Sequence, residues 1–233
     1  MSLPTELRRL LRPLKRRWLR ARKQRALGPL RRYVYQSSTI AGWARDDEAA
    51  ELVLVARALP AGATIVEVGS FLGSSAVLLA GARKVAGSGM VHCVDPFDGS
   101  GDAHSVPVYE ELTAGLATTL RSQFEANIAA ADLTSWVTVH QGSAEAIAAG
   151  WSTSIDLLFL DGDHSPAGAR SNYEAWIPFL RAGGTIAIHN SVDRTYSPDH
   201  DGQRRVVVES IHPPAFDAVR CVGTTTFASK VGP

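Results

Sequence analysis

The stretch "LFLDGDHSPAG", residues 158–168, places two carboxylates and a histidine within four positions, directly after an apolar run. Asp161, Asp163 and His164 have the residue types needed to take up a proton, orient a substrate or bind a cation, because carboxylates are anionic and imidazole titrates near neutral pH. The same residues also suit a polar turn in which Asp163 or His164 only caps the next helix. The surrounding elements must decide between these interpretations.

Apolar, β-branched runs predict five buried strands, and the segments between them predict helices. This alternation favours right-handed βαβ units and a mostly parallel sheet with both faces covered. In the tail, "RRVVVESI" suits a helix or a strand, and the runs on either side of Gly223 predict an antiparallel hairpin that closes the sheet. The predicted strands are 64–70, 89–97, 136–143, 155–163 and 185–190; the predicted helices are 46–58, 74–85, 108–131 and 171–180, with 33–43 as an irregular lead-in.

The composition suits one α/β domain, with 45% hydrophobic residues in a chain of 233. No segment approaches the ~18 consecutive apolar residues of a membrane-spanning helix, and the basic N-terminus lacks the apolar core of a signal peptide. Cys93 and Cys221 are isolated, without C-x-x-C spacing. These features favour a reducing cytoplasm.

Residues 1–32 form a basic arm in front of a domain that spans 33–233. The arm holds 12 of the 24 Lys and Arg residues and one acid, Glu6, so its net charge is +11 and that of the remainder is −10. Its apolar residues recur at helical spacing, and Pro13 divides or kinks the predicted helix. Three partners suit such an arm: the acidic domain of its own or a second subunit, an anionic membrane surface, and nucleic acid.

Ligands of open α/β sheets bind beyond the carboxyl ends of the strands, so the polar residues there are the candidate site. "EVGSFLGSS", residues 67–75, is a glycine turn without the G-x-G-x-x-G spacing, and Glu67 beside it suits an ammonium group better than a phosphate. Asp95 ends the second strand, where a carboxylate can accept both hydroxyls of a ribose. The loops with His104 and His200 flank the expected mouth, and Tyr35 and Trp43 either shape an acceptor pocket or simply pack.

Together these motifs resemble the class I S-adenosylmethionine (SAM)-dependent methyltransferases over about residues 40–230. The motifs are "VEVGSFLGSSAVLLA", "VDPFDG", "GSAE" and "LDGDHSPAGARSNYEAWIPFLRAGGTIAIHN". The last is similar to the small O-methyltransferase branch of catechol-type enzymes and of sugar methyltransferases from actinobacterial natural-product and methylmannose-polysaccharide pathways. The resemblance implies a Rossmann-like fold with a seven-stranded sheet and a terminal antiparallel strand.

The resemblance also assigns roles to the strand ends. The glycine loop would hold the methionine part of SAM, Asp95 the ribose, and Ser143 would border the adenine. His164 matches the position of the basic catalytic residue, with Asp161 beside it. Relatives bind a divalent ion at Asp161 and the 189–190 pair, so Mg²⁺ or another divalent cation is an open expectation here, where Asn190 replaces a second carboxylate. The expected cofactor contacts are Glu67, Gly69, Ser70, Phe71, Gly73, Ser74, Ser75, Asp95, Ser143 and Asp161; the expected metal ligands are Asp161, His189 and Asn190.

The leading hypothesis is therefore SAM-dependent methylation of a hydroxyl on a small acceptor, a sugar or glycoside, by a cytoplasmic homo-oligomer, with a dimer expected. Methylation of a catechol or phenol is the alternative. Nucleic-acid methylation is weaker because no N/D-P-P-Y/F/W motif follows the fourth strand. A nicotinamide-dependent oxidoreductase is disfavoured by the glycine spacing and by Glu67, and a non-catalytic scaffold is the third class.

Overall fold

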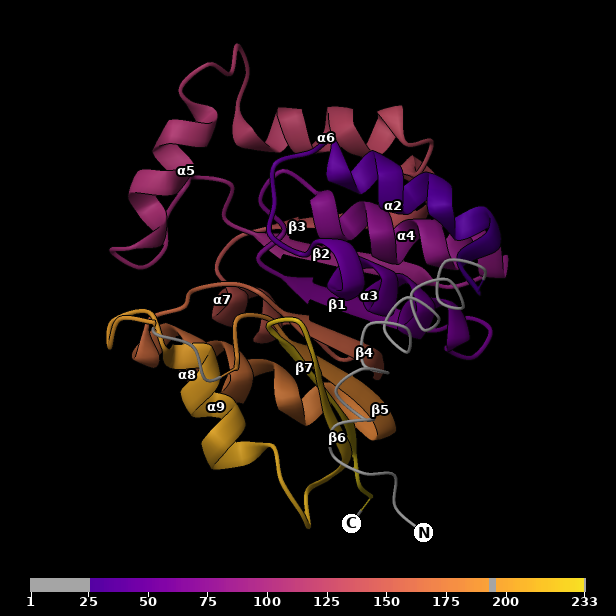
Figure 1. The fold of residues 1–233 in the computed structure, drawn as a ribbon, viewed down its shortest axis with the longest axis vertical. Coiled ribbons are helices and arrows are strands. Elements are labelled where there is room, and N and C mark those ends of the chain that lie inside the picture. Colours follow the sequence, from indigo (N-terminus) through magenta and orange to yellow (C-terminus); the bar gives the residue numbers. More distant parts are fainter. Residues whose placement is uncertain (1–25, 193–195, 233) are drawn as a thin grey trace, which may run out of the picture.

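The computed structural model describes residues 26–192 and 196–232, and seven strands in them form one sheet. The strands are β1 (Thr64–Val68), β2 (Met90–Asp95), β3 (Val137–Gln141), β4 (Ile155–Leu160), β5 (Leu180–Ile188), β6 (Phe216–Val222) and β7 (Thr225–Lys230). Their order is β3-β2-β1-β4-β5-β7-β6, and strands β1 to β5 run parallel (Figure 1). Strand β7 is antiparallel to both β5 and β6. The predicted mostly parallel seven-stranded sheet with a terminal antiparallel hairpin is confirmed.

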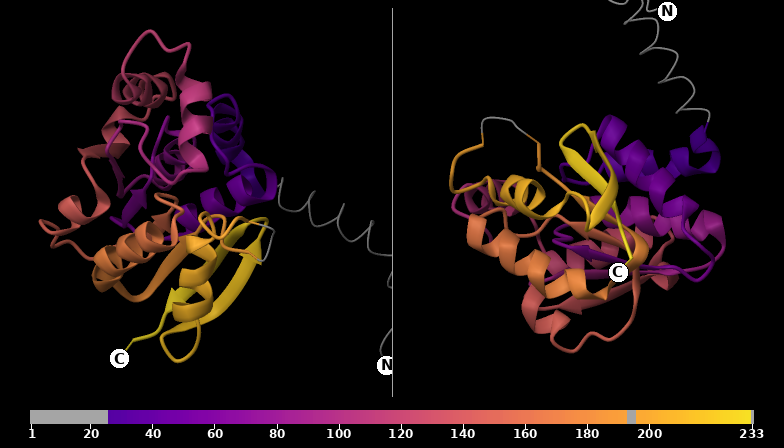
Figure 2. Two further views of the ribbon diagram at one scale, coloured as in Figure 1. Left: turned by 90° about the vertical axis from the view of Figure 1, so that its left-hand side faces the viewer. Right: turned by 90° about the horizontal axis from the view of Figure 1, so that it is seen from below.

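Helices cover both faces of the sheet (Figures 1 and 2). One core joins α2, α3, α4 and α6 to alternate strand residues such as Ile65 and Cys93, and the other joins α7, α8 and α9 to Val66 and Val94. Because both faces are buried at the centre of the sheet, β1 and β4 are nearly continuous apolar runs rather than alternating ones. The helices are α2 (Arg31–Ser38), α3 (Asp46–Ala58), α4 (Ser74–Ala86), α5 (Ser105–Thr113), α6 (Leu120–Ala130), α7 (Ala144–Ala148), α8 (Pro166–Trp176) and α9 (Gly202–Ser210), with single turns η1 (Gly28–Leu30), η2 (Thr134–Trp136) and η3 (Ile177–Phe179).

The lead-in expected to be irregular over 33–43 is helical up to Ser38, where α2 ends, and irregular only over 39–43. Tyr33 of this helix is buried, and a Cβ at Gly81 of α4 would stand only 2.2 Å from the Tyr33 ring. Because Gly81 has no side chain, the Tyr33 ring of α2 packs directly on the backbone of α4. Tertiary packing, rather than local propensity, makes this segment helical.

Two further boundaries differ from the predictions. The single helix expected over 108–131 is two helices, because Thr119 adopts an extended conformation and its side chain caps the N-terminus of α6 by accepting a hydrogen bond from Ser122 N. The "RAGG" segment lies inside β5 as an irregularity, since Ile155 pairs with Leu180 but Leu157 pairs with Thr185. In the tail, "RRVVVESI" is helical in α9.

Most of the basic arm, with Pro13, lies outside the residues that the structure describes, so its expected partners stay predictions. The last turn of the arm packs on the domain: Arg32 donates a hydrogen bond from Nη2 to the carbonyl of Ala131 at 3.3 Å. In the described parts of the chain, the search for a helix long and apolar enough to cross a membrane finds none.

Candidate functional site

A cavity of about 580 Å³ lies across the carboxyl ends of β3, β2, β1, β4 and β5, where the strand order reverses between β1 and β4. This is the place at which open α/β sheets bind their ligands. Three predicted site residues, Glu67, Gly73 and His189, do not line it. The predicted residues that do line it are Gly69, Ser70, Phe71, Ser74, Ser75, Asp95, Ser143, Asp161, His164 and Asn190.

The glycines of the β1–α4 loop serve the packing of the protein itself. Gly69 has φ +88°, and a Cβ there would stand 2.2 Å from the carbonyl oxygen of Asp161. A Cβ on Gly73 would meet the ring of Phe124 at 3.0 Å. The missing side chains therefore let the end of β4 and helix α6 close in on the loop, while the loop backbone at Gly69 still borders the cavity.

Asp95 fixes the shape of this loop. Its Oδ2 accepts hydrogen bonds from the backbone amides of Ser70 (2.9 Å) and Phe71 (2.8 Å), and Oδ1 accepts one from Phe97 N (2.7 Å). Phe71 and Phe97 have φ of +46° and +55°, a region that residues with a Cβ rarely adopt. Burial raises the pKa of Asp95, although the three amides oppose the shift. A carboxylate has about four lone-pair sites, so Asp95 keeps capacity for a ribose hydroxyl.

Glu67 lies beneath the loop rather than in the cavity. The side chain is fully buried, Oε2 accepts a hydrogen bond from Ser70 Oγ at 2.6 Å, and Oε1 has no partner. Burial raises the pKa of this carboxyl to about 7. Through Ser70, which does line the cavity, Glu67 supports the cofactor loop from below.

At the end of β3, Ser143 lines the cavity and also caps α7. Its Oγ accepts a hydrogen bond from Ala146 N at 3.2 Å. The preceding Gly142 donates its amide hydrogen to the carbonyl of Asp95 at 3.1 Å, which ties this corner to the end of β2. The third strand end thus borders the cavity next to the second, as the sequence led us to expect.

The "DGDH" turn brings Asp161 and His164 together at the end of β4. His164 is 4% exposed, its Nε2 lies 3.4 Å from Asp161 Oδ1, and its Nδ1 is buried without a partner. Neither His164 nor Asp163 is the helix cap: Ser165 caps α8 by accepting from Gly168 N, and Asp163 Oδ1 accepts from Ser165 N at 2.7 Å. Asp163 and Ser165 therefore form the polar turn that leads into α8, whereas His164 lines the cavity.

The structure separates the expected metal ligands. His189 is 1% exposed and its Nδ1 lies 3.1 Å from Thr225 Oγ1 and 4.0 Å from Glu48 Oε1, away from the cavity. Asn190 does line the cavity, but its Oδ1 accepts a hydrogen bond from the Tyr196 hydroxyl at 3.1 Å. Across 26–192 and 196–232, no three or more His, Cys, Asp or Glu side chains gather in an arrangement suited to a metal ion.

Two loops add residues that the sequence analysis placed only near the mouth or missed. His104 and His200 both line the cavity, and His200 Nδ1 lies 3.0 Å from Oδ1 of Asp102, a residue we had not singled out. Its place in a polar loop, "DGSGDAHS", after the second strand is the sequence signal that could have identified Asp102. A second histidine of the cavity wall, His200, is therefore paired with a carboxylate that lies behind the lining.

Aromatic side chains form one wall of the cavity. The ring of Phe71 lies 5.7 Å from that of Trp43 and 4.9 Å from that of Tyr109. Burial and the charge of Asp161 raise the pKa of Tyr109, so its phenol stays protonated at neutral pH. Trp43 does shape the pocket, whereas Tyr35 is 72% exposed and lies outside it.

This fold, with its ligand cavity at the strand ends, is that of a class I methyltransferase. A family model described as a methyltransferase domain matches residues 66–191, more than half of the chain, and the chain belongs to that family. The predicted family and fold are thereby confirmed.

Many solved structures share this fold, and three methyltransferases among them are similar to this chain over most of its length. The O-methyltransferase TomG of Streptomyces achromogenes, involved in tomaymycin synthesis and solved with SAM, is 20% identical, with 79% of this chain and 80% of that chain covered and a TM-score of 0.57. A methyltransferase of Podospora anserina bound to S-adenosylhomocysteine is 13% identical, with 88% of each chain covered and a TM-score of 0.61. A TDP-rhamnose 3'-O-methyltransferase of calicheamicin biosynthesis is 17% identical, with 78% and 76% covered and a TM-score of 0.50.

Proposed function

We propose that the protein transfers the methyl group of SAM to a hydroxyl of a small acceptor, with a sugar or glycoside as the preferred class. The observation that carries the proposal is the pairing of His164 with Asp161 at the end of β4, in the same cavity as the glycine loop at the end of β1. A methyl donor held by the loop and a hydroxyl held by the histidine would meet inside this one cavity.

The loop residues fit the proposed cofactor. Ser70, Ser74 and Ser75 offer hydroxyls to the amino-acid end of SAM, above the buried carboxylate of Glu67 with its unpartnered Oε1. Next to this loop, Asp95 at the end of β2 would bind the ribose, and Ser143 after β3 would border the adenine. These strand ends are neighbours in the sheet, as the ribose and the adenine are in SAM. TomG and the Podospora anserina enzyme, solved with SAM and S-adenosylhomocysteine, support the same choice of cofactor.

SAM supplies an activated methyl group, whose bond to sulfur breaks as the bond to the acceptor oxygen forms, with S-adenosylhomocysteine as the leaving group. With Nε2–H facing Asp161, His164 takes up the hydroxyl proton on Nδ1, the ring nitrogen that has no partner, as attack proceeds, which removes the need to form a free alkoxide. Asp161 then stabilises the resulting imidazolium, because its Oδ1 lies 3.4 Å from Nε2. Asp161 is itself held in place by its backbone amide, which donates to the carbonyl of Val68 at 2.9 Å.

A divalent ion does not fit this set of donors well. Asp161 supplies one carboxylate, the amide oxygen of Asn190 is engaged by Tyr196, and His189 is directed at Thr225 instead. Mg²⁺ is usually held by one or two carboxylates with several waters, so Asp161 alone would bind it weakly. We therefore assign no step of the reaction to a metal.

Methylation of a catechol or phenol is the second candidate. The aromatic wall of Trp43, Phe71 and Tyr109 favours a flat ring as the acceptor. The sugar class is supported by the histidine at the base position and by the fold shared with the TDP-rhamnose methyltransferase. A cytoplasmic homo-oligomer remains part of the proposal.

A labelled-methyl transfer screen over sugars, glycosides and phenols, run with Mg²⁺ and with a chelator, tests the acceptor and the metal together. We expect methyl transfer to hydroxylated acceptors, and we expect this transfer to persist in the presence of the chelator. A thermal-shift comparison tests the cofactor: S-adenosylhomocysteine should raise the melting temperature, whereas NAD and NADP should not. Stabilisation by a nicotinamide cofactor alone would overturn the proposal, and steeply salt-dependent binding to duplex DNA or structured RNA would favour a nucleic-acid substrate.

A further inference from the structure

The pair formed by Asp102 and His200 joins two loops across the cavity mouth. His200 Nδ1 lies 3.0 Å from Asp102 Oδ1, and Asp102 also accepts hydrogen bonds from Ser105 Oγ (2.6 Å) and His104 N (2.9 Å). Asp102 and His200 are 5% and 8% exposed. A carboxylate with this many partners has a fixed position, and so does the imidazole that it holds. His200 lies beyond the residues 66–191 that the family model matches.

Asp102 also decides which nitrogen of His200 carries the hydrogen. Burial tends to raise the pKa of Asp102, but the hydrogen bonds from Ser105, His200 and the His104 amide outweigh it and lower the pKa to about 2. An ionised carboxylate only accepts hydrogen bonds, so Nδ1 of His200 must be the N–H donor. Burial lowers the pKa of His200 itself, which keeps the ring neutral at neutral pH. Its Nε2 therefore presents a lone pair, on a residue that lines the cavity.

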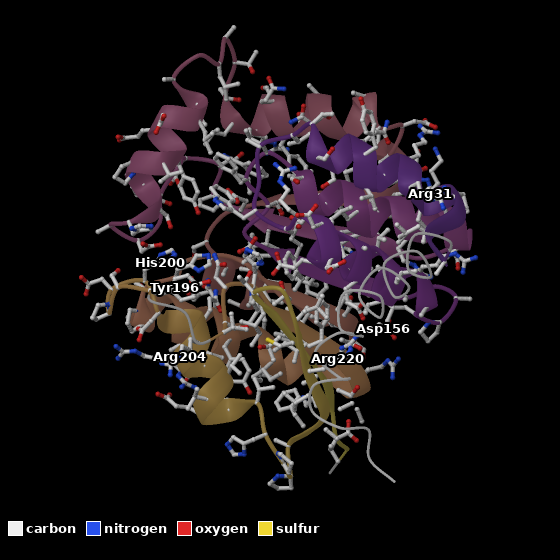
Figure 3. The ribbon with its side chains drawn as sticks, viewed as in Figure 1. Arg31, Asp156, Tyr196, His200, Arg204 and Arg220 are labelled. Atoms are coloured by element: carbon white, nitrogen blue, oxygen red, sulfur yellow. The ribbon has the colours of Figure 1, made fainter. Side chains whose placement is uncertain are left out.

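His200 stands directly beside the proposed base. The rings of His164 and His200 are stacked, with centroids 4.7 Å apart and an interplanar angle of 21°. The amide of Gly202 donates to the carbonyl of His164 at 3.0 Å, and a Cβ on Gly202 would stand 2.3 Å from the carbonyl oxygen of Ser165. The start of α9 is thus seated on the 164–165 turn, which fixes the two rings relative to each other. Figure 3 shows His200 next to Tyr196, between α5 and α9.

We propose that His200, oriented by Asp102, accepts a hydrogen bond from a second hydroxyl of the acceptor, on the carbon next to the one whose hydroxyl is methylated beside His164. The inference rests on the proposed O-methylation and narrows its acceptor to a vicinal diol. Two nearly parallel imidazoles, each paired with its own carboxylate, place two proton-accepting rings side by side. A vicinal diol carries two hydroxyl donors on adjacent carbons, which matches that arrangement.

An acceptor without the second hydroxyl would leave Nε2 of His200 cut off from water and unpaired. Such an unpaired buried group reduces kcat/KM for the deficient substrate by roughly 10- to 100-fold. His200 is then a specificity-determining residue, and its removal should affect the preference between acceptors more than binding of the cofactor.

The test compares matched acceptors that differ by one hydroxyl: methyl hexopyranosides with their monodeoxy counterparts, and catechol with phenol. Labelled-methyl transfer gives kcat/KM for wild type, His200→Leu, Asp102→Asn and the control His212→Gln, whose imidazole is exposed on the surface. We expect wild type and the control to prefer the diol by about 10- to 100-fold, and His200→Leu to bring the ratio within about threefold of unity. Asp102→Asn should reduce the ratio as well, because an amide no longer fixes the tautomer.

Three results would overturn the inference. The first is that wild type accepts both members of each pair equally, and the second is that His200→Leu keeps the full preference. If His200→Leu fails to fold, as judged by loss of stabilisation by S-adenosylhomocysteine, an unchanged ratio in Asp102→Asn counts against the inference in its place. Wild type that binds S-adenosylhomocysteine but methylates no hydroxylated probe refutes the proposed function itself, which is a distinguishable outcome.

Discussion

Gly69 lies against Asp161 so closely that a Cβ built on Gly69 would stand 2.2 Å from the Asp161 carbonyl oxygen and 2.7 Å from Cα of Gly162. The cofactor loop at the end of β1 and the "DGDH" turn at the end of β4 are therefore in direct backbone contact. This contact sets the distance between the proposed methyl-donor site and the proposed base.

Replacing Gly69 with alanine should destabilise the protein strongly. The residue has φ +88°, which costs a side-chain-bearing residue roughly 1–2 kcal/mol, and the clash with backbone atoms cannot be relieved by rotating a side chain. We expect a total loss of more than about 3 kcal/mol in the free energy of urea unfolding.

Gly62→Ala is the matched control for Gly69→Ala. Gly62 has φ +73°, and no atom lies within 4 Å of a Cβ built there, so only the conformational cost applies. Equal losses in the two variants would show that the contact between Gly69 and Asp161 does not contribute.

Most of the sheet was predictable from the sequence because its strands are rich in apolar residues, in nearly continuous runs in β1 and β4, which are buried on both faces. The ends of those runs also placed the glycine loop, Asp95, Ser143, Asp161 and His164 at one edge. Periodicity carries no such information for the loop between β2 and α5, where Asp102 lies. Its pairing with His200 joins residues 98 positions apart, and only the fold brings them together.

The differences from the expected site come from side-chain direction. His189 and Asn190 form a turn after β5, where Asn190 has φ +50°, and only Asn190 reaches the cavity. Glu67 in β1 likewise faces the helix layer with Cys93 rather than the ligand. A resemblance gives positions along the chain, whereas the local backbone, the pleat of β1 at Glu67 and the turn after β5 at His189 and Asn190, decides which of them face the cavity.

Asp95→Asn should loosen the cofactor loop. An asparagine has one amino group, which cannot accept hydrogen bonds, so at least one of the three amides of Ser70, Phe71 and Phe97 loses its acceptor. We expect affinity for S-adenosylhomocysteine to fall about 10-fold or more by calorimetry, with a lower melting temperature. Asp98→Asn is the control, because Asp98 is exposed and its Oδ1 accepts a hydrogen bond from Ser100 N outside the glycine loop. Similar losses in both variants would contradict this role for Asp95.

Glu67→Gln should change how stability depends on pH. Burial raises the pKa of Glu67 from 4.5 to about 7. Between pH 4.5 and pH 7, the folded state therefore keeps a proton on this carboxyl that the unfolded state has released. Stability from this group is therefore complete below about pH 4.5 and is lost as the pH rises to 7. The loss amounts to about 3 kcal/mol at most, and the glutamine variant, which does not ionise, should avoid it. Urea unfolding of both proteins at pH 5 and pH 8 measures the difference, and parallel pH profiles would refute the assignment.

His164→Ala should reduce methyl transfer by roughly 10²- to 10⁴-fold, the usual contribution of a positioned general base, while leaving cofactor binding intact. Cofactor binding is spared because the glycine loop and Asp95 belong to β1 and β2, whereas His164 follows β4. Single-turnover transfer from labelled SAM measures the first effect, and the thermal shift with S-adenosylhomocysteine measures the second. His164→Gln separates proton transfer from packing, since it keeps a polar side chain that cannot take up the proton at neutral pH. Transfer by His164→Gln at the wild-type rate would show that His164 is not the base and would leave His200, in the stacked ring 4.7 Å away, as the residue to examine for that role.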